Sequence, residues 1–237
     1  MLPYVIVDVM SSDEDDLKIA AAESAVKQVT DGMIVGLGSG STAAFAVSAL
    51  GRRVAEGLRI VGIPTSERTA AQARALRIPL SNLDEKPQVD ITIDGADEVE
   101  ESKLNLIKGR GGALLREKII ASASGRLVII VHSDKLVSRL GVHDPVPVEV
   151  TPFGWQVTAV RLSSLGAKPS IRRNPDGEPF RTDGGNYIVD CTFEAIVSAE
   201  SLAGQLDHVV GVVEHGLFVG LTSEVHVAGA GGVRILR

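Results

Sequence analysis

Short apolar runs alternate with helix-like segments through the first half of the chain. The apolar runs are residues 33–36, 59–63, 89–93 and 126–131, and the helical segments are residues 15–29, 43–50, 66–76 and 113–123. Near-continuous apolar runs are typical of parallel strands that are buried on both faces. Strand and helix in regular alternation predict an α/β fold with a doubly wound, mostly parallel sheet.

The pattern changes after Leu140, where prolines and polar residues interrupt it. We expect strands at residues 146–150, 187–193, 211–219 and 224–228, helices at residues 154–165 and 198–206, and a hairpin and loop at residues 169–185. This less regular order favours a second, smaller α+β domain. We therefore predict a Rossmann-like catalytic domain over residues 1–141 plus 212–237, and a small domain over residues 142–211.

A loop rich in glycine and hydroxyl groups, Gly36-Leu-Gly-Ser-Gly-Ser-Thr42, joins the first strand to its helix. Backbone N–H groups at a helix N-terminus, together with Ser and Thr hydroxyls, favour a bound phosphate. The loop departs from a dinucleotide fingerprint, because Ser41 stands at the third glycine position, and it lacks the lysine of a Walker A loop. A small anion-binding loop fits better, and a purely structural tight turn is the alternative.

Two carboxylates end the third strand, and a basic glycine loop and another carboxylate follow. Asp94-Gly-Ala-Asp97 comes directly after residues 89–93, at the strand end where open α/β sheets present their ligand sites. Lys108-Gly-Arg-Gly-Gly112 precedes a helix that carries Glu117 near its start. Acid, cation and acid at one edge predict an acid–base site. The alternative is a turn followed by a solvated helix face.

Composition narrows the classes of function. The chain has 237 residues, 44% hydrophobic and 23% charged, which is ordinary for a globular protein of one large or two smaller domains. A net charge of −6 argues against a broad nucleic-acid footprint but permits a local phosphate pocket. The lone Cys191 excludes an internal disulfide and favours the cytoplasm. The five histidines show no metal-ligand spacing, so no metal site is predicted.

The first residues do not resemble a targeting segment. Residues 1–10 are apolar, but they lack a positively charged start and run into the acidic residues 11–16. We therefore expect neither a signal peptide nor a membrane span, and we expect the ordered fold to begin after this extension.

Six short motifs occur in the order expected of ribose-5-phosphate isomerase type A, which the chain resembles from about Leu17 to its C-terminus. They are Gly36-Leu-Gly-Ser-Gly-Ser-Thr-Ala43, Asp94-Gly-Ala-Asp-Glu98, Lys108-Gly-Arg-Gly-Gly-Ala113, Arg116-Glu-Lys118, Val146-Pro-Val-Glu-Val150 and Gly211-Val-Val-Glu-His-Gly-Leu-Phe218. Each motif alone is weak, but six in order are specific. Arg110 stands where the family has glycine, and Ser39 stands where threonine is usual.

The resemblance implies a reversible interconversion of D-ribose 5-phosphate and D-ribulose 5-phosphate in the non-oxidative pentose phosphate pathway, without metal or organic cofactor. It implies that Glu117 moves a proton between C2 and C1 and that Lys108 offsets charge on the enediolate oxygen. Asp94 and Asp97 would bind sugar hydroxyls, with Asp94 assisting ring opening. The implied substrate-binding residues are Lys18, Ser39, Gly40, Ser41, Thr42, Asp94, Gly95, Ala96, Asp97, Lys108, Gly109, Arg110, Gly111 and Lys135, of which Lys18, Ser41, Thr42 and Lys135 would hold the phosphate. Family members are homodimers or homotetramers, and the small domain usually contributes to assembly.

The reaction itself calls for these residue types. A proton next to a carbonyl group is weakly acidic, so a carboxylate base must act together with an electrophile on the oxygen. Two alternatives remain at this point. One is a domain that senses sugar phosphates without turnover, and the other is a CoA transferase with a glutamate nucleophile.

Overall fold

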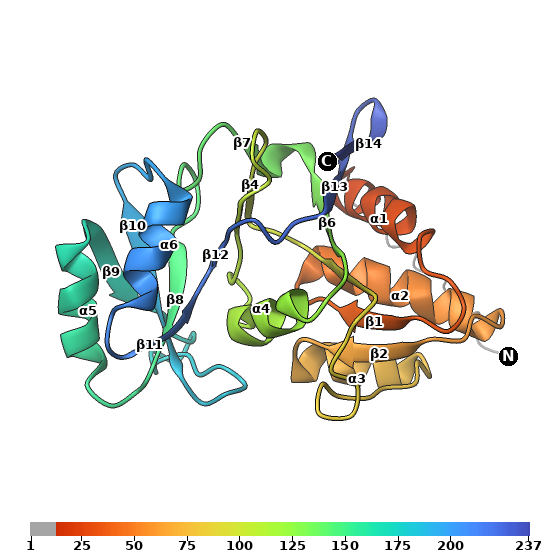
Figure 1. Cartoon of the computed structure of the whole chain (residues 1–237), viewed down its shortest axis with the longest axis horizontal. Helices are drawn as coiled ribbons and strands as arrows, with labels where there is room; N and C mark the ends of the chain where they lie inside the picture. The colour runs from red at the N-terminus through yellow and green to blue at the C-terminus, as the bar shows by residue number, and fades with distance from the viewer. Residues whose placement is uncertain (1–12) are drawn as a thin grey trace, which may run out of the picture.

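The structure is a computed structural model that describes residues 13–237, and it contains three sheets. The expected extension lies almost entirely outside the described residues. Figure 1 shows a six-stranded sheet with its helices at one end of the molecule and a four-stranded sheet with two helices at the other. A third sheet of short strands connects these two parts.

The six-stranded sheet confirms the predicted α/β class. Its strands run in the order β14-β13-β6-β3-β1-β2, and all neighbours are parallel except the edge pair β13 and β14. The strands are β1 (Ile34–Leu37), β2 (Val61–Pro64), β3 (Ile91–Asp94), β6 (Leu127–His132), β13 (Glu224–Gly229) and β14 (Gly232–Leu236). The helices are α1 (Asp13–Val26), α2 (Ser41–Ala55), α3 (Glu67–Ala75) and α4 (Leu114–Ser122).

The central strand β6 is apolar from Leu127 to Val131 and ends at His132. Val128 and Ile130 pack into the cluster that contains the buried alanines of α1 and α2. Leu127, Ile129 and Val131 pack on the opposite face, with Phe218 and with residues of β13. All six residues of β6 are buried, because the sheet is covered on both faces.

The second sheet is antiparallel, as the α+β prediction requires. Its order is β11-β8-β10-β9, and α5 (Trp155–Ser164) and α6 (Ala199–Asp207) belong to this part of the chain. The strands are β8 (Val146–Val150), β9 (Ala167–Ile171), β10 (Tyr187–Phe193) and β11 (Val212–His215). Strand β9 begins before the polar stretch that we assigned wholly to a hairpin and loop.

The prediction of one continuous strand at residues 211–219 is wrong. The chain forms β11 in the second sheet and then, after Gly216, a separate strand β12 (Leu217–Phe218) in the third sheet. The chain therefore leaves the second sheet at His215, four residues later than the boundary predicted at residue 211. The division into two domains itself stays a prediction.

The third sheet was not predicted. It consists of β4 (Glu98–Glu100), β5 (Leu106–Ile107), β7 (Leu136–Val137) and β12, in the order β12-β5-β4-β7. A short 3₁₀ turn at Ser133–Lys135 precedes β7. Strands of two or three residues are too short to show periodicity in a sequence. This sheet holds the segment between Asp97 and Lys108, so it sets the spacing of the predicted acid–base site.

Among residues 13–237, no helix is long and apolar enough to cross a bilayer.

Candidate active site

A cavity of about 270 Å³ lies at the carboxyl ends of the parallel strands, where such sheets place ligands. Every sequence-predicted site residue except Asp94 lines it, and Asp94 lies directly behind Lys108. Three further lining residues, Glu14, Arg68 and His132, were missed by sequence reasoning. The resemblance thus identified residues that the fold does bring together.

Lys108 lies at the closed end of this cavity and is only 3% exposed. Its Nζ donates to the backbone oxygen of Gly95 at 2.7 Å and lies 3.1 Å from both Asp94 Oδ2 and Glu117 Oε2. Burial acts to lower the pKa of Lys108, but attraction to Asp94, Glu117 and Asp97 outweighs it and raises that pKa. The lysine is therefore a permanent cation between two carboxyl groups.

Glu117 lies in the first turn of α4 and is 5% exposed. Burial raises the pKa of Glu117 to about 8, against the attraction of Lys108. Apart from its ion pair with Lys108, the oxygen Oε2 has no hydrogen-bond partner among residues 13–237. One ammonium group offsets the charge of only one carboxylate, so the raised pKa values of Asp94 and Glu117 favour a proton on this pair. Glu117 is thus suited to take up and return a proton near neutral pH.

Asp94 ends strand β3 and is fixed by the glycine loop. Its Oδ1 accepts hydrogen bonds from the backbone N–H groups of Ser39 at 3.1 Å and Gly95 at 2.8 Å. A Cβ atom on Gly38 would lie 2.3 Å from the same oxygen, so no other residue fits there without displacing Asp94. Burial raises the pKa of Asp94. The loop between β1 and α2 therefore packs against Asp94, which belongs to the predicted acid–base site, and it also faces the cavity.

Arg110, the unexpected residue in the second glycine loop, forms part of the wall around Asp97. Its backbone N–H donates to Asp97 Oδ2 at 2.9 Å, and its guanidinium pairs with Asp144. Arg172, just after β9, donates to the backbone oxygens of Gly109 at 2.9 Å and Arg110 at 2.8 Å. The loop is thus held from the second sheet. Burial raises the pKa of Asp97.

The other end of the cavity has the chemistry of an anion site. Helix α2 begins at Ser41 after Gly40, whose φ of 99° favours glycine, so its first N–H groups and the Ser41 and Thr42 hydroxyls lie at the cavity wall. Lys18, Lys135 and Arg68 add positive charge to this wall. Arg68 follows the carboxyl end of β2 at the start of α3, a position from which it could have been predicted.

Ser39 differs from the other residues of the loop. Its hydroxyl group bonds to Thr65 and Ser66 at 2.7 Å each and to Thr69 at 3.1 Å, all behind the cavity. Its side chain joins α3 to the glycine loop, and its backbone N–H supports Asp94. The contribution of Ser39 to the cavity is therefore structural support of the loop.

Lys18 already has anionic neighbours in this cavity. Its Nζ lies 2.8 Å from Glu14 Oε1 and 3.3 Å from Asp15 Oδ1, and Glu14 lies 3.7 Å from His132 Nε2. A bound phosphate would compete with these carboxylates for the ammonium group. We had placed Glu14 outside the ordered fold, and nothing in the sequence marked it as a cavity residue.

Fold and site together define an α/β protein with an acid–base group at one end of a cavity and an anion site at the other. A model of the ribose 5-phosphate isomerase A family (phosphoriboisomerase A) matches residues 61–232. The ribose-5-phosphate isomerase A of Gloeobacter violaceus is 59% identical, and that of a Synechococcus strain is 54% identical, each over 94% of this chain and 97% of the relative. The chain belongs to the ribose 5-phosphate isomerase A family.

Solved structures agree with this assignment. The ribose 5-phosphate isomerase A of Methanocaldococcus jannaschii superposes with a TM-score of 0.91 at 43% identity, over 94% of this chain and 99% of that one. A D-ribose-5-phosphate isomerase in complex with phospho-erythronic acid gives a TM-score of 0.92 at 38% identity, over 95% of this chain and 100% of that one. The mixed α/β architecture with its separate antiparallel sheet is thus that of the family.

Proposed function

We propose that this chain interconverts D-ribose 5-phosphate and D-ribulose 5-phosphate through an enediolate, as a step of the non-oxidative pentose phosphate pathway. Membership of the family supports the isomerase and neither of the two alternatives, the sugar-phosphate sensor and the CoA transferase. The observation that carries the proposal is Lys108, whose ammonium group lies 3.1 Å from both Asp94 and Glu117 at the buried end of the cavity.

Glu117 is the base in this proposal. Its Oε2, which apart from the ion pair with Lys108 has no partner among the described residues, removes the proton from C2 of the open-chain aldose and returns it to C1. The electron pair of the broken C–H bond forms the C1–C2 double bond of the enediolate, and negative charge develops on the carbonyl oxygen at C1. When the proton returns to C1, the hydroxyl proton of the C2 oxygen passes to the C1 oxygen, so that the carbonyl group ends at C2. The buried ammonium of Lys108 stabilises that charge, because a fixed cation in a site shielded from water acts more strongly than one in solvent.

Asp94 and Asp97 bind the sugar hydroxyls and assist ring opening in this proposal. Both lie beside Lys108, and burial raises the pKa of each carboxyl group. A carboxyl group with a raised pKa exchanges protons more readily near neutral pH. Asp94, which is held by two backbone N–H groups, is the better placed for a fixed role in ring opening.

The phosphate binds at the other end, among the first N–H groups of α2, Ser41, Thr42, Lys18 and Lys135. We add Arg68 to the sequence-predicted set because it lines the same wall. Binding energy from a group remote from the reaction holds C1 and C2 in place beside the base. The proposed step uses side chains alone and needs no metal ion or organic cofactor.

We also propose a homodimer or homotetramer that acts in the cytoplasm. Several strongly exposed apolar side chains between residues 153 and 210 support assembly, since exposed apolar side chains are often buried in interfaces. They are Phe153, Val157, Val160, Val197 and Val210. The buried, lone Cys191 is compatible with a reducing compartment. Sedimentation velocity tests the assembly, and a monomer at micromolar concentration would contradict it.

The function is tested by incubating the purified protein with D-ribose 5-phosphate and following D-ribulose 5-phosphate by a coupled assay. We expect turnover in both directions. Binding without turnover would favour the sensor, and neither binding nor turnover would reopen the transferase.

A further inference from the structure

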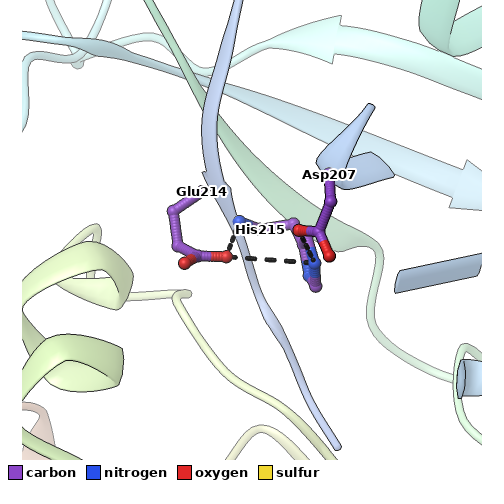
Figure 2. A group of neighbouring side chains, drawn as sticks. All are labelled: Asp207, Glu214 and His215. Atoms are coloured by element: carbon purple, nitrogen blue, oxygen red, sulfur yellow. Dashed lines mark hydrogen bonds and ion pairs between the residues drawn. The ribbon is translucent and has the colours of Figure 1, made fainter. Parts of the chain in front are cut away.

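Lys118, the residue after Glu117 on α4, contacts a second cluster of charged side chains away from the cavity. Its Nζ donates to Glu214 Oε1 and to the backbone oxygen of His215, at 2.6 Å each. Figure 2 shows Glu214, His215 and Asp207, with the His215 ring next to the Asp207 carboxylate. Strand β11 carries Glu214 and His215, so Lys118 ties the helix of Glu117 to the second sheet.

The three side chains in Figure 2 have the spacing of metal ligands, but their hydrogen bonds argue against a metal. His215 Nδ1 accepts the backbone N–H of Leu217 at 3.2 Å, which assigns the ring proton to Nε2, facing Asp207 at 3.1 Å. A metal on Nε2 would move this proton to Nδ1, against the Leu217 N–H. The ammonium of Lys118 also occupies the Glu214 oxygen that a metal would need.

The segment that receives Lys118 also holds Lys108. The backbone N–H of Lys108 donates to the oxygen of Gly216 at 2.9 Å, and β12 pairs with β5 directly before Lys108. A Cβ atom on Gly216 would lie 2.1 Å from the Lys108 oxygen, so the two backbones touch. Both ammonium groups also lie near the buried ring of Phe218, Lys108 at 5.4 Å and Lys118 at 5.1 Å from its centroid.

We propose that Lys118 is a positioning residue for the isomerisation, because it fixes α4 to the segment 214–218 that holds Lys108. The base and its cation come from different elements, α4 and the end of β5, and this segment touches both. The inference rests on the roles proposed above for Glu117 and Lys108. Lys118 itself does not line the cavity and does not contact the substrate in this proposal.

Replacing Lys118 with methionine tests the tie, since methionine keeps the length of the side chain and loses the charge. A misplacement of about 1 Å can cost on the order of 10²-fold in rate. We expect Lys118→Met to lower kcat by roughly 10- to 100-fold, with KM changed by less than about twofold. We expect Lys118→Arg, which keeps a cation, to recover a large part of the loss.

The pH profile gives a second readout that simple loss of stability would not change. The attraction of Lys108 lowers the pKa of Glu117, so a looser pair lets that pKa rise. In Lys118→Met, kcat should therefore begin to fall at a higher pH than in the wild type as the solution is made more acidic. Melting temperatures of all variants show the folded fraction at the assay temperature.

Arg116 offers a matched control on the same helix. Its guanidinium pairs with Glu67 at 2.9 Å and Asp183 at 3.4 Å, so it also ties α4 to distant residues, but not to the segment 214–218. Arg116→Met should keep the wild-type kcat and pH profile. Glu214→Gln should also lower kcat. In the double variant of Lys118→Met and Glu214→Gln, the fold-loss of kcat should be smaller than the product of the two single fold-losses.

A folded Lys118→Met variant with wild-type kcat would overturn the proposal, as would independent, multiplicative losses in the double variant. An equal loss in Arg116→Met would show that α4 is merely destabilised, and would also overturn it. If Lys118→Met does not fold, Glu214→Gln tests the proposal instead. An unchanged kcat in Glu214→Gln would then overturn it. Wild-type turnover of ribose 5-phosphate is measured in the same series, so a failure of the proposed function is seen separately.

Discussion

At the scale of single residues, the central feature is an imbalance of charge around Lys108. Two buried carboxyl groups lie 3.1 Å from one ammonium group, so they cannot both be ionised without cost. Burial raises the pKa of both, and that of Glu117 reaches about 8. The proposed base, Glu117, is therefore a side chain whose ionised form burial destabilises.

We expect Glu117→Gln to lower kcat by roughly 10²–10⁴-fold with KM little changed, because glutamine keeps the shape but removes the basic oxygen. Steady-state kinetics on a preparation with a normal circular dichroism spectrum measures this. If Glu117 is only an acid at a helix start, kcat will stay at the wild-type level, and the base must then be sought in Asp94 or Asp97.

We expect kcat/KM to fall as the pH drops below about 8, since the ionised form of Glu117 is the base and its pKa is about 8. If the base were an exposed glutamate, kcat/KM would fall only near the ordinary glutamate pKa of about 4.3. A pH–rate profile of the free enzyme distinguishes the two cases, and a flat profile down to pH 5 would contradict the assignment.

The same shift makes a prediction for stability. In the unfolded chain Glu117 has an ordinary pKa of 4.5, and burial raises this pKa to about 8 in the folded state. Between these values the folded state keeps a proton that the unfolded state has lost, so this group makes the protein less stable as the pH rises. From about pH 6 to about pH 9, the melting temperature of Glu117→Gln should fall less than that of wild type. If the melting temperatures of the two proteins changed equally with pH, Glu117 would not be the cause of the pH dependence of stability.

At the scale of elements, the long apolar runs were predictable and the short strands were not. Burial on both faces favours apolar residues in β6 from Leu127 to Val131, so its sequence alone marks it as a strand. By contrast, β4, β5, β7 and β12 have two or three residues each, and their pairing is decided by tertiary contacts.

The candidate site divides in the same way. The order of the motifs predicted the acid–base residues and the phosphate loop, because each of these groups lies within a short stretch of sequence. Glu14 was missed because it reaches the cavity from a helix whose sequence carries no motif. Arg68 also belongs to no motif, and only its place after the carboxyl end of β2 could have indicated it. The role of Ser39 also depends on contacts with Thr65, Ser66 and Thr69, which no local pattern reveals.

The anion site at the start of α2 makes a prediction at this scale. Lys135 lies in the 3₁₀ turn after β6 and reaches the same wall as Ser41 and Thr42. Lys135→Ala should raise KM for ribose 5-phosphate by about 10-fold or more, the effect of about 1.4 kcal/mol. Free ribose should be a very poor substrate for the wild type. Equal efficiency on ribose and its phosphate would remove the phosphate role from this end of the cavity.

At the scale of the whole molecule, the proposed reaction relies on a cation that the chain itself supplies. In this proposal Lys108 places its positive charge beside the substrate oxygen. Lys118 contacts Glu214 in the one group with metal-like spacing within residues 13–237. We therefore expect full activity after dialysis against EDTA. Loss of activity that a divalent cation restores would reveal a metal role that we have not assigned.

The pairing of β5 with β12 also sets the order in which the site can be completed during synthesis. Lys108 and Lys118 find their partners in Gly216, Glu214 and His215, close to the end of the chain. Ribosomes add about 5–20 residues per second, so the first parallel strands emerge several seconds before these partners do. A nascent chain halted before residue 214 would hold the phosphate loop without the contacts that join base and cation. We therefore expect a chain halted before residue 214 to be inactive.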